Sequence, residues 1–226
     1  MSLALPSYKI SKLTSENWLK DYTIKFDAFE IADFCIYGIH QNTPPQTNKI
    51  LLQIYAATAF GSNHQTTQCC IEAISELYHQ KFSPTNILDI GTGSGILSLC
   101  ASKLWPNSKI LAGDIDEESV VVTQNNAATN NLGEQITSLH SDGYQNPHIK
   151  SNKPYQLILS NILANPLIAF APDLSSHLAE NGYCILSGFI DNQVSDVISA
   201  HEQHGLKLIK LYSKDNWRAA LMQKKV

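Results

Sequence analysis

The sequence predicts an α/β fold: a doubly wound, Rossmann-like, mostly parallel seven-stranded sheet with an antiparallel edge strand. From residue 66 onward, short apolar runs typical of buried strands alternate with patterns typical of helices. Two apolar runs close the chain with no helix between them, which indicates an antiparallel pair at one edge of the sheet. We expect residues 1–55 to form a short N-terminal extension packed on the α/β domain, which spans residues 56–226.

The first elements follow from apolar spacing and from proline. The apolar run 34–39 is predicted to be a strand, and two prolines predict a loop at 42–46 because proline removes a backbone donor. Residues 66–81 carry apolar side chains at three-to-four spacing, so they are predicted to form a helix. Thr66 or Thr67 is the expected cap of this helix.

Strands and helices then alternate. A strand is predicted at 86–90, where an apolar run ends in glycine, and a helix at 96–104 follows it directly. The next strand is predicted at 109–113. The helix after it, 117–130, begins behind Asp116, whose side chain is the expected cap.

The second half of the domain continues the pattern. Strands are predicted at 136–140 and 155–160, and a helix at 166–179 has proline in its first turn and Gly182 beyond its end. A strand at 183–189 comes next. The remaining elements are a helix that begins at Asp191 and ends before Gly205, and the closing strands 206–212 and 217–222.

Composition narrows the range of functions. Sixteen Lys and Arg against twenty Asp and Glu give a net charge of −4, which disfavours a nucleic-acid partner. No run approaches the roughly 18 apolar residues that a membrane span needs, so no membrane partner is expected. The five cysteines include no C-x-x-C pair, which argues against a disulfide framework and a thiolate metal site. We expect buried free thiols, no metal and a reducing compartment, the cytoplasm.

A glycine-rich turn lies between the predicted strand 86–90 and the predicted helix 96–104. Glycines let a backbone approach a ligand closely, and a helix that begins at once offers free N–H groups. The spacing is G-x-G-x-G, and Ile96 stands where a dinucleotide fingerprint needs glycine, which disfavours an NAD-dependent oxidoreductase. The candidate binding residues of this turn are Asp89, Gly91, Thr92, Gly93 and Gly95.

Two carboxylates follow the next two predicted strands. Asp114 can accept hydrogen bonds from both hydroxyls of a ribose, with Ile115 beside it in the same site. Asp142 can accept a hydrogen bond from an adenine amine. Either carboxylate taken alone also fits a turn or a helix cap. Because the carboxyl ends of parallel strands share one edge of the sheet, the glycine turn and both carboxylates together predict an adenosine-containing ligand.

Several other polar residues are not expected to bind a ligand. His64 precedes the predicted helix 66–81, where it either helps to order the loop or is solvated. Two asparagine pairs lie near the end of the predicted helix 117–130 and are expected to be solvated. These pairs are Asn125 with Asn126 and Asn130 with Asn131.

Residues 87–99 resemble the first motif of the class I S-adenosylmethionine (AdoMet) methyltransferases. Three further segments, 59–67, 160–167 and 216–220, resemble one family of that class, the PrmA family, which methylates amines of a ribosomal protein of the large subunit. The resemblance covers roughly residues 56–223. It implies that the α/β domain is an AdoMet-binding methyltransferase domain.

Carried onto this sequence, the resemblance implies roles for individual residues. Thr67 touches the methionine end of AdoMet, Gly91 lies against the cofactor and Asp114 holds the ribose. Asn161 faces the methyl-transfer region, where it is the candidate catalytic residue because its side-chain carbonyl can orient an acceptor amine. Phe60 either covers the cofactor or packs in the core.

The leading hypothesis is an AdoMet-dependent methyltransferase of PrmA-like type that acts on a protein amine, either a lysine or an N-terminus. The ribosomal protein is implied as a partner by the resemblance alone. Two features depart from the family pattern: the loop 61–64 is one residue shorter, and residues 1–55 are expected to lack the N-terminal ferredoxin-like docking domain. The alternatives are a methyltransferase for a small molecule or RNA, an NAD-dependent oxidoreductase and a non-catalytic AdoMet-binding module.

Overall fold

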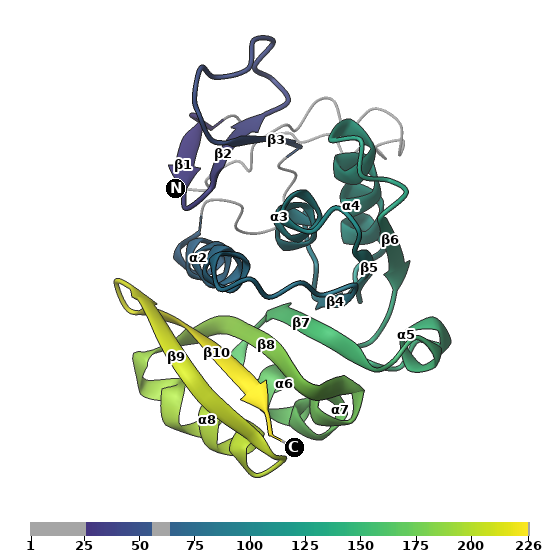
Figure 1. The fold of residues 1–226 in the computed structure, drawn as a ribbon, viewed down its shortest axis with the longest axis vertical. Coiled ribbons are helices and arrows are strands. Elements are labelled where there is room, and N and C mark those ends of the chain that lie inside the picture. The colour runs from purple at the N-terminus through teal and green to yellow at the C-terminus, as the bar shows by residue number, and fades with distance from the viewer. Residues whose placement is uncertain (1–25, 56–63, 226) are drawn as a thin grey trace, which may run out of the picture.

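The computed structural model describes residues 26–55 and 64–225 (Figure 1). A seven-stranded sheet runs through it in the order β6-β5-β4-β7-β8-β10-β9. Neighbouring strands from β6 to β8 are parallel, and β10 is antiparallel to both β8 and β9, so the predicted sheet is confirmed. The strands are β4 (Asn86–Ile90), β5 (Lys109–Asp114), β6 (Ile136–His140), β7 (Tyr155–Asn161), β8 (Leu178–Ile190), β9 (Leu206–Lys214) and β10 (Trp217–Lys224).

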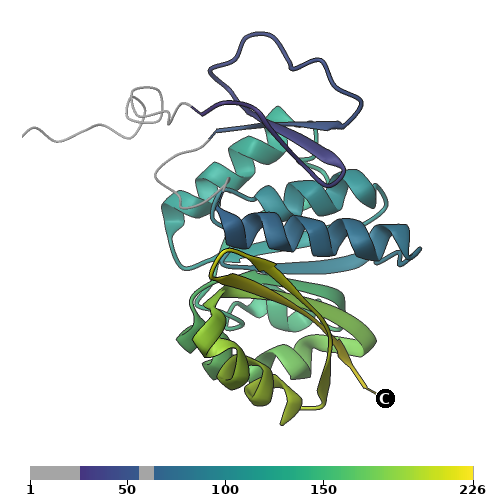
Figure 2. The ribbon, with the colours of Figure 1, turned by 90° about the vertical axis from the view of Figure 1, so that its left-hand side faces the viewer.

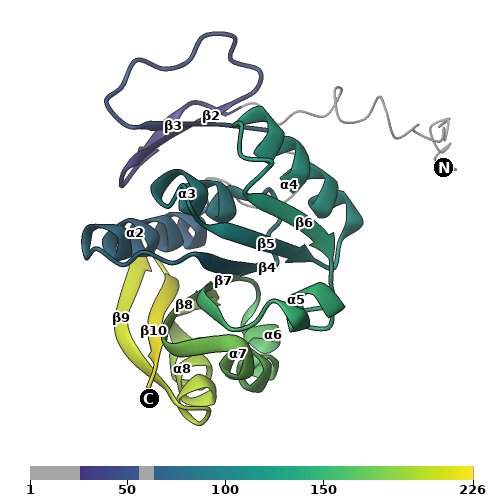
Figure 3. The same cartoon turned by 45° about the vertical axis from the view of Figure 1, so that its right-hand side comes forward.

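Helices cover both faces of this sheet (Figure 3). One face carries α2 (Gln65–His79), α3 (Ile96–Leu104) and α4 (Glu117–Thr129). Within the described residues, no helix has the length and apolar character that crossing a bilayer requires. The opposite face carries α5 (Pro147–Ser151), α6 (Ala164–Ala169), α7 (Ala171–His177) and α8 (Val194–Glu202), which a 3-10 turn, η1 (Asp191–Gln193), precedes.

A small second sheet precedes the α/β domain in the chain. It contains β1 (Phe29–Ile31), β2 (Phe34–Gly38) and β3 (Ile50–Ile54), with β1 antiparallel and β3 parallel to β2. Figure 2 shows this sheet as a layer on the outer side of the helices, away from the large sheet. β2 confirms the predicted strand 34–39, whereas β1 and β3 were not predicted.

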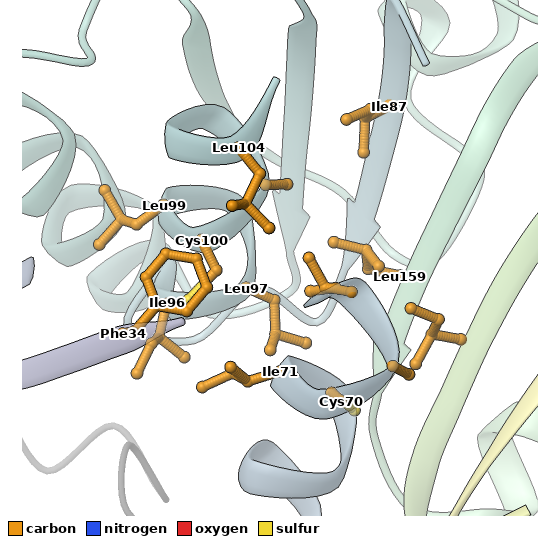
Figure 4. Packing of buried hydrophobic residues seen from close by; sticks show 14 of the residues in the cluster. Phe34, Cys70, Ile71, Ile87, Ile96, Leu97, Leu99, Cys100, Leu104 and Leu159 are labelled. Carbon is orange, nitrogen blue, oxygen red and sulfur yellow. The ribbon is translucent and has the colours of Figure 1, made fainter. Parts of the chain in front are cut away.

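The small sheet contributes side chains to the core of the α/β domain. Phe34 and Ile36 of β2 and Leu52 of β3 are fully buried. They belong to the same apolar cluster as Ile71 of α2 and Cys100 of α3 (Figure 4). Burying a side chain of this size stabilises a fold by about 1.5–3 kcal/mol. The segment therefore packs on the main domain as expected, and the domain boundary at residue 56 stays a prediction.

Helix α2 has a different cap from the one predicted. His64 is its N-cap: the ring Nδ1 accepts a hydrogen bond from the Thr66 N–H at 3.4 Å and lies 3.0 Å from the Thr66 hydroxyl. Thr66 and Thr67 are buried inside the first turn instead. His64 is thus hydrogen-bonded to the first turn of α2, and its effect on the loop before it lies outside the described residues. Asp116 caps α4 as predicted, accepting hydrogen bonds from two backbone N–H groups of the first turn.

The prediction of one helix at 166–179 was wrong. Two short helices, α6 and α7, meet there at Phe170. Pro172 lies in the first turn of α7 and explains the break, because proline has no N–H for the helical bond to the fourth residue before it. β8 then begins at Leu178, before the predicted 183, and Asn181, with a positive φ, lies in an irregular part of this strand.

Burial corrects one prediction and confirms another. Of the four asparagines expected to be solvated, Asn125 and Asn131 are exposed, but Asn126 and Asn130 are only 0% and 7% exposed. The side-chain amides of these two bond to the backbone in or directly after β3. The thiol prediction is confirmed, since all five cysteines are buried and none forms a disulfide.

Gly188 of β8 lies very close to the backbone of Ile162, the residue that follows β7. Its φ is +98°, and a Cβ there would lie 2.0 Å from the carbonyl oxygen of Ile162. We expect Gly188→Ala to lower the free energy of unfolding by roughly 3 kcal/mol or more, because backbone strain and a clash with main chain add together. Urea unfolding measures this loss.

Gly205 is the matched control. Its φ is +85°, but a Cβ there would meet nothing within 4 Å. Gly205→Ala is expected to cost only about 1–2 kcal/mol, the strain of a left-handed backbone alone. Equal losses in the two variants would contradict the close contact at Gly188.

Candidate active site

The glycine turn between β4 and α3 has the backbone that its sequence predicts. Gly91, Gly93 and Gly95 all have positive φ, at +73°, +57° and +79°. A Cβ on Gly91 would lie 2.1 Å from the side chain of Ile162, so this position has no space for any other residue. Glycine therefore serves both the conformation of the turn and its approach to the end of β7.

Asp89 and Thr92 stabilise the turn through buried hydrogen bonds. The Asp89 carboxylate is 1% exposed and accepts hydrogen bonds from the hydroxyls of Thr92 and Ser98, at 2.9 and 2.6 Å through Oδ2. Burial raises the pKa of Asp89 to about 6. Neither Asp89 nor Thr92 lines either of the two pockets described next. Both therefore stabilise the turn without facing the pockets.

The first pocket, here called the carboxylate pocket, has a volume of about 340 Å³ and lies at the carboxyl ends of β4, β5 and β6. It brings together four predicted residues, Gly91, Asp114, Ile115 and Asp142. The side chain of Ile115 is largely exposed at this site, with 65% of its surface accessible. The other lining residues are Ile90, Ser141, Gly143, Ile162, Leu163, Pro166 and Phe170.

Asp114 fixes the turn and faces the carboxylate pocket. Its Oδ2 accepts a hydrogen bond from the Gly93 N–H at 2.9 Å, and its Oδ1 accepts one from the Asp116 N–H at 3.0 Å. A carboxylate has roughly four acceptor positions, so acceptor capacity remains for a ligand. Asp114 is thus already oriented by the backbone it holds.

The second pocket, here called the amide pocket, has a volume of about 390 Å³. It contains Asn161 at the end of β7 and Thr67 in the first turn of α2. The Asn161 Nδ2 donates to the Thr67 hydroxyl at 3.1 Å, so these two predicted residues meet across 94 positions of sequence. The other lining residues are His64, Thr66, Ile162, Leu163, Gly188 and Trp217.

The two pockets are adjacent because Ile162 and Leu163 line both of them. The sequence argument assigned no role to either residue, although both lie in the segment 160–167 that carries the family resemblance. It also missed Trp217, which lines the amide pocket and meets the His64 ring edge-on at 4.8 Å between centroids. Trp217 likewise lies in a resembling segment, which was the available signal. Phe60 and most of the loop 61–64 lie outside the described residues.

A pocket of about 330 Å³ also lies near the amino ends of β4 and β5, where Thr85 and Ser108 precede the two strands. It contains none of the predicted site residues. Ligands of open parallel sheets bind at the carboxyl ends of the strands, so the carboxylate and amide pockets form the candidate active site.

Comparison with known proteins gives consistent results. Residues 1–225 match the family model described as ribosomal protein L11 methyltransferase (PrmA). The ribosomal protein L11 methyltransferase of Brucella suis is 41% identical over 213 residues, which cover 94% of this chain and 74% of that protein. The one of Rhodopseudomonas palustris is 32% identical, over 98% of this chain and 75% of that protein.

Solved structures show the same fold. The ribosomal protein L11 methylase of Lactobacillus delbrueckii subsp. bulgaricus superposes with a TM-score of 0.79 at 28% identity, over 89% of this chain and 100% of that one. An O-methyltransferase of Bacillus cereus, solved in complex with SAH, has a TM-score of 0.58 at 13% identity, over 74% of this chain and 85% of that one, and bears on the fold alone.

The Rossmann-like sheet, with its glycine turn and two adjacent pockets at the strand ends, has the architecture of the ribosomal protein L11 methylase it superposes on, and the chain is a class I methyltransferase. The match to the family model extends over almost the entire sequence. The chain belongs to the ribosomal protein L11 methyltransferase (PrmA) family.

Asp89 predicts a pH dependence of folding. Its pKa of about 6 in the folded protein lies above its ordinary value of 3.8, so the folded state binds the proton more tightly than the unfolded state. The stability of the wild type relative to Asp89→Asn is therefore highest below pH 4 and falls as the pH rises through 6. The expected fall is about 3 kcal/mol, since each unit of pKa shift corresponds to roughly 1.4 kcal/mol.

Urea unfolding of both proteins at several pH values between 4 and 7.5 measures this difference. Asn keeps an oxygen acceptor for the Thr92 and Ser98 hydroxyls and does not titrate. A difference that stays constant across this range would contradict the proposed cost of ionising Asp89.

Proposed function

We propose that this methyltransferase uses AdoMet and that its acceptor is an amine of a protein. The observation that carries the proposal is the pair of adjacent pockets. One holds the carboxylates of Asp114 and Asp142, the other holds the hydrogen-bonded Asn161 and Thr67, and the segment of Ile162 and Leu163 lies between them. A ligand with a polar adenosine at one end and a reactive methyl group at the other matches this arrangement.

The carboxylate pocket suits the adenosine end of AdoMet. Asp114 has acceptor positions for the ribose hydroxyls, and the exposed Asp142 has them for the adenine amine. Ile115 offers an apolar surface to the base. Gly91 and Gly93 let the turn lie against the cofactor without side chains between them.

The amide pocket suits the methionine end of AdoMet and the acceptor. When bound, AdoMet supplies a methyl group that its sulfonium already activates, so alignment of the acceptor is the main task of the protein. Thr67 fixes the side chain of Asn161 by accepting its Nδ2–H. The Asn161 carbonyl oxygen then accepts a hydrogen bond from an N–H of the acceptor amine, which points the nitrogen lone pair along the line of attack.

The lining of the amide pocket favours a neutral amine. None of its described lining residues is a carboxylate, and Trp217, Ile162 and Leu163 present apolar surface. An ammonium ion placed there loses hydration without a compensating charge, whereas a neutral amine keeps its lone pair for attack. The proton therefore leaves to water before transfer.

The relatives' names support a ribosomal protein as the acceptor, through a lysine or its N-terminus. We assign the methyltransferase domain to residues 56–226 and the extension to residues 1–55. Five buried unpaired thiols support the cytoplasm as the compartment.

Cofactor binding is tested by thermal unfolding with AdoMet, S-adenosylhomocysteine or NAD. At 100 times its dissociation constant a ligand stabilises by about 2.7 kcal/mol, a shift of several degrees for a chain of this size. We expect this shift with AdoMet and S-adenosylhomocysteine and not with NAD. Asp114→Ala should weaken AdoMet binding about a hundredfold, because each hydrogen bond to a charged group contributes about 1.5–3 kcal/mol.

Asp116→Ala is the matched control, two positions away. Asp116 caps α4 and does not line the carboxylate pocket. We expect this variant to lose about 1 kcal/mol of stability and to keep its AdoMet affinity. A shift with NAD alone, or unchanged affinity in Asp114→Ala, would overturn the cofactor assignment.

Asn161→Ala is expected to lower kcat for methyl transfer to ribosomal protein L11 by about a hundredfold, because the acceptor amine loses its alignment. Transfer of a radiolabelled methyl group from AdoMet measures the rate, and the melting temperature of the variant is expected to change little. Asn165→Ala is the control in the same segment, since Asn165 is exposed and lines neither pocket. Equal rates in the two variants would exclude a catalytic role for Asn161.

A further inference from the structure

Helix α4 holds the small sheet through two asparagine side chains. The Asn126 Oδ1 accepts the Tyr55 N–H at 2.7 Å, and its Nδ2 donates to the Tyr55 carbonyl at 3.2 Å. Asn130 makes the same pair of bonds to Gln53, at 3.0 and 2.7 Å. Four helical residues rise about 6 Å and two strand residues about 6.6 Å, so the two spacings match. The asparagines occupy the place of a neighbouring strand beside β3.

The same helix holds the glycine turn. The second N–H of Asn126 Nδ2 donates to the Ser94 carbonyl at 2.8 Å. One helical turn away, the Thr123 hydroxyl donates to the Gly93 carbonyl at 3.0 Å. Two successive carbonyls of the turn are therefore drawn toward α4, while the Gly93 N–H is held on the other side by Asp114.

Asn126 has one arrangement that satisfies all of its partners. Its side chain is fully buried, its oxygen faces a donor, and its nitrogen faces two carbonyls. A flipped amide would place N–H against the Tyr55 N–H and oxygen against both carbonyls. Buried polar groups left without partners are costly, so the side chain is locked in place.

We propose that Asn126 is a positioning residue that couples the small N-terminal sheet to the cofactor turn. The proposal rests on the proposed function, because it requires AdoMet to lie against residues 91–95. Through Asn126, the position of Tyr55 sets the position of the Ser94 carbonyl and with it the peptide between Ser94 and Gly95. Coupling between sites is reciprocal, so AdoMet binding also stabilises the attachment of β3 to α4.

Asn130 provides a matched control for the test. Each asparagine side chain makes three hydrogen bonds, two of them to the backbone in or directly after β3. The third bond of Asn126 goes to Ser94 in the turn, whereas the third bond of Asn130 goes to the Asn126 carbonyl within α4. Asn126→Ala and Asn130→Ala thus remove the same number of bonds and differ in the contact with the turn.

AdoMet affinity, measured by titration calorimetry on the full chain, separates the two roles. We expect similar falls in melting temperature for both variants, with the dissociation constant at least about fivefold higher in Asn126→Ala than in Asn130→Ala. Because the turn binds cofactor, the apparent KM for AdoMet should rise while kcat at saturating AdoMet stays close to that of Asn130→Ala. Equal dissociation constants in the two variants would overturn the coupling.

A second pair of variants keeps the test decisive if Asn126→Ala does not fold. Asn126→Ser and Asn130→Ser add no charge to these buried positions, keep a neutral hydroxyl, and lose the amide that bridges two backbone segments. The same difference in affinity is expected between them, and its absence overturns the coupling. The wild type separates this outcome from a wrong cofactor: if it does not bind AdoMet, the proposed function fails instead.

Discussion

Ile162 lies between two glycines of neighbouring strand ends, and the arrangement of both pockets depends on this contact. β4, β7 and β8 are neighbours in the sheet. A Cβ on Gly91 after β4 would strike the Ile162 side chain, and a Cβ on Gly188 in β8 would strike its carbonyl oxygen. The chain leaving β7 is thus held between the two strands beside it. Because Ile162 and Leu163 line both pockets, this packing sets the position of the segment that lies between them.

The glycine turn is shaped by two carboxylates acting from opposite sides. Asp89 holds hydroxyl groups beneath it, and Asp114 holds the Gly93 N–H from the side of the pocket. Burial is the main reason that the pKa of Asp89 is raised, and the negative charge of Asp114 adds to it. The turn therefore keeps its geometry at some cost in stability, which the large shared core can offset.

Local patterns predicted most of the α/β domain. The strands around the glycine turn are continuous apolar runs, and Asp116 is a cap that acts within its own helix, so both were visible in the sequence. The failures involve competition or distance. His64, and not Thr66, caps α2, and Pro172 divides a predicted helix in two. β3 was not predicted, because the side chains that pair with its edge come from a distant part of the sequence.

The same distinction applies to the candidate site. The turn, Asp114 and Asp142 follow strand ends, so topology alone brings them to one edge. Thr67 and Asn161 came from the family resemblance, and the bond between them depends on how α2 packs over β7. Ile162, Leu163 and Trp217 were missed because apolar residues carry no chemical signal until the pockets they line are known.

The small sheet is bound to the α/β domain by polar as well as apolar contacts. β3 is at the edge of its sheet, and an open edge is a site of unwanted pairing. Here Asn126 and Asn130 satisfy four backbone groups along that edge, while Leu52 and Ile54 enter the core shared with α3. Separation would expose apolar surface and leave two buried amides without their partners. The small sheet and the α/β domain therefore stabilise each other.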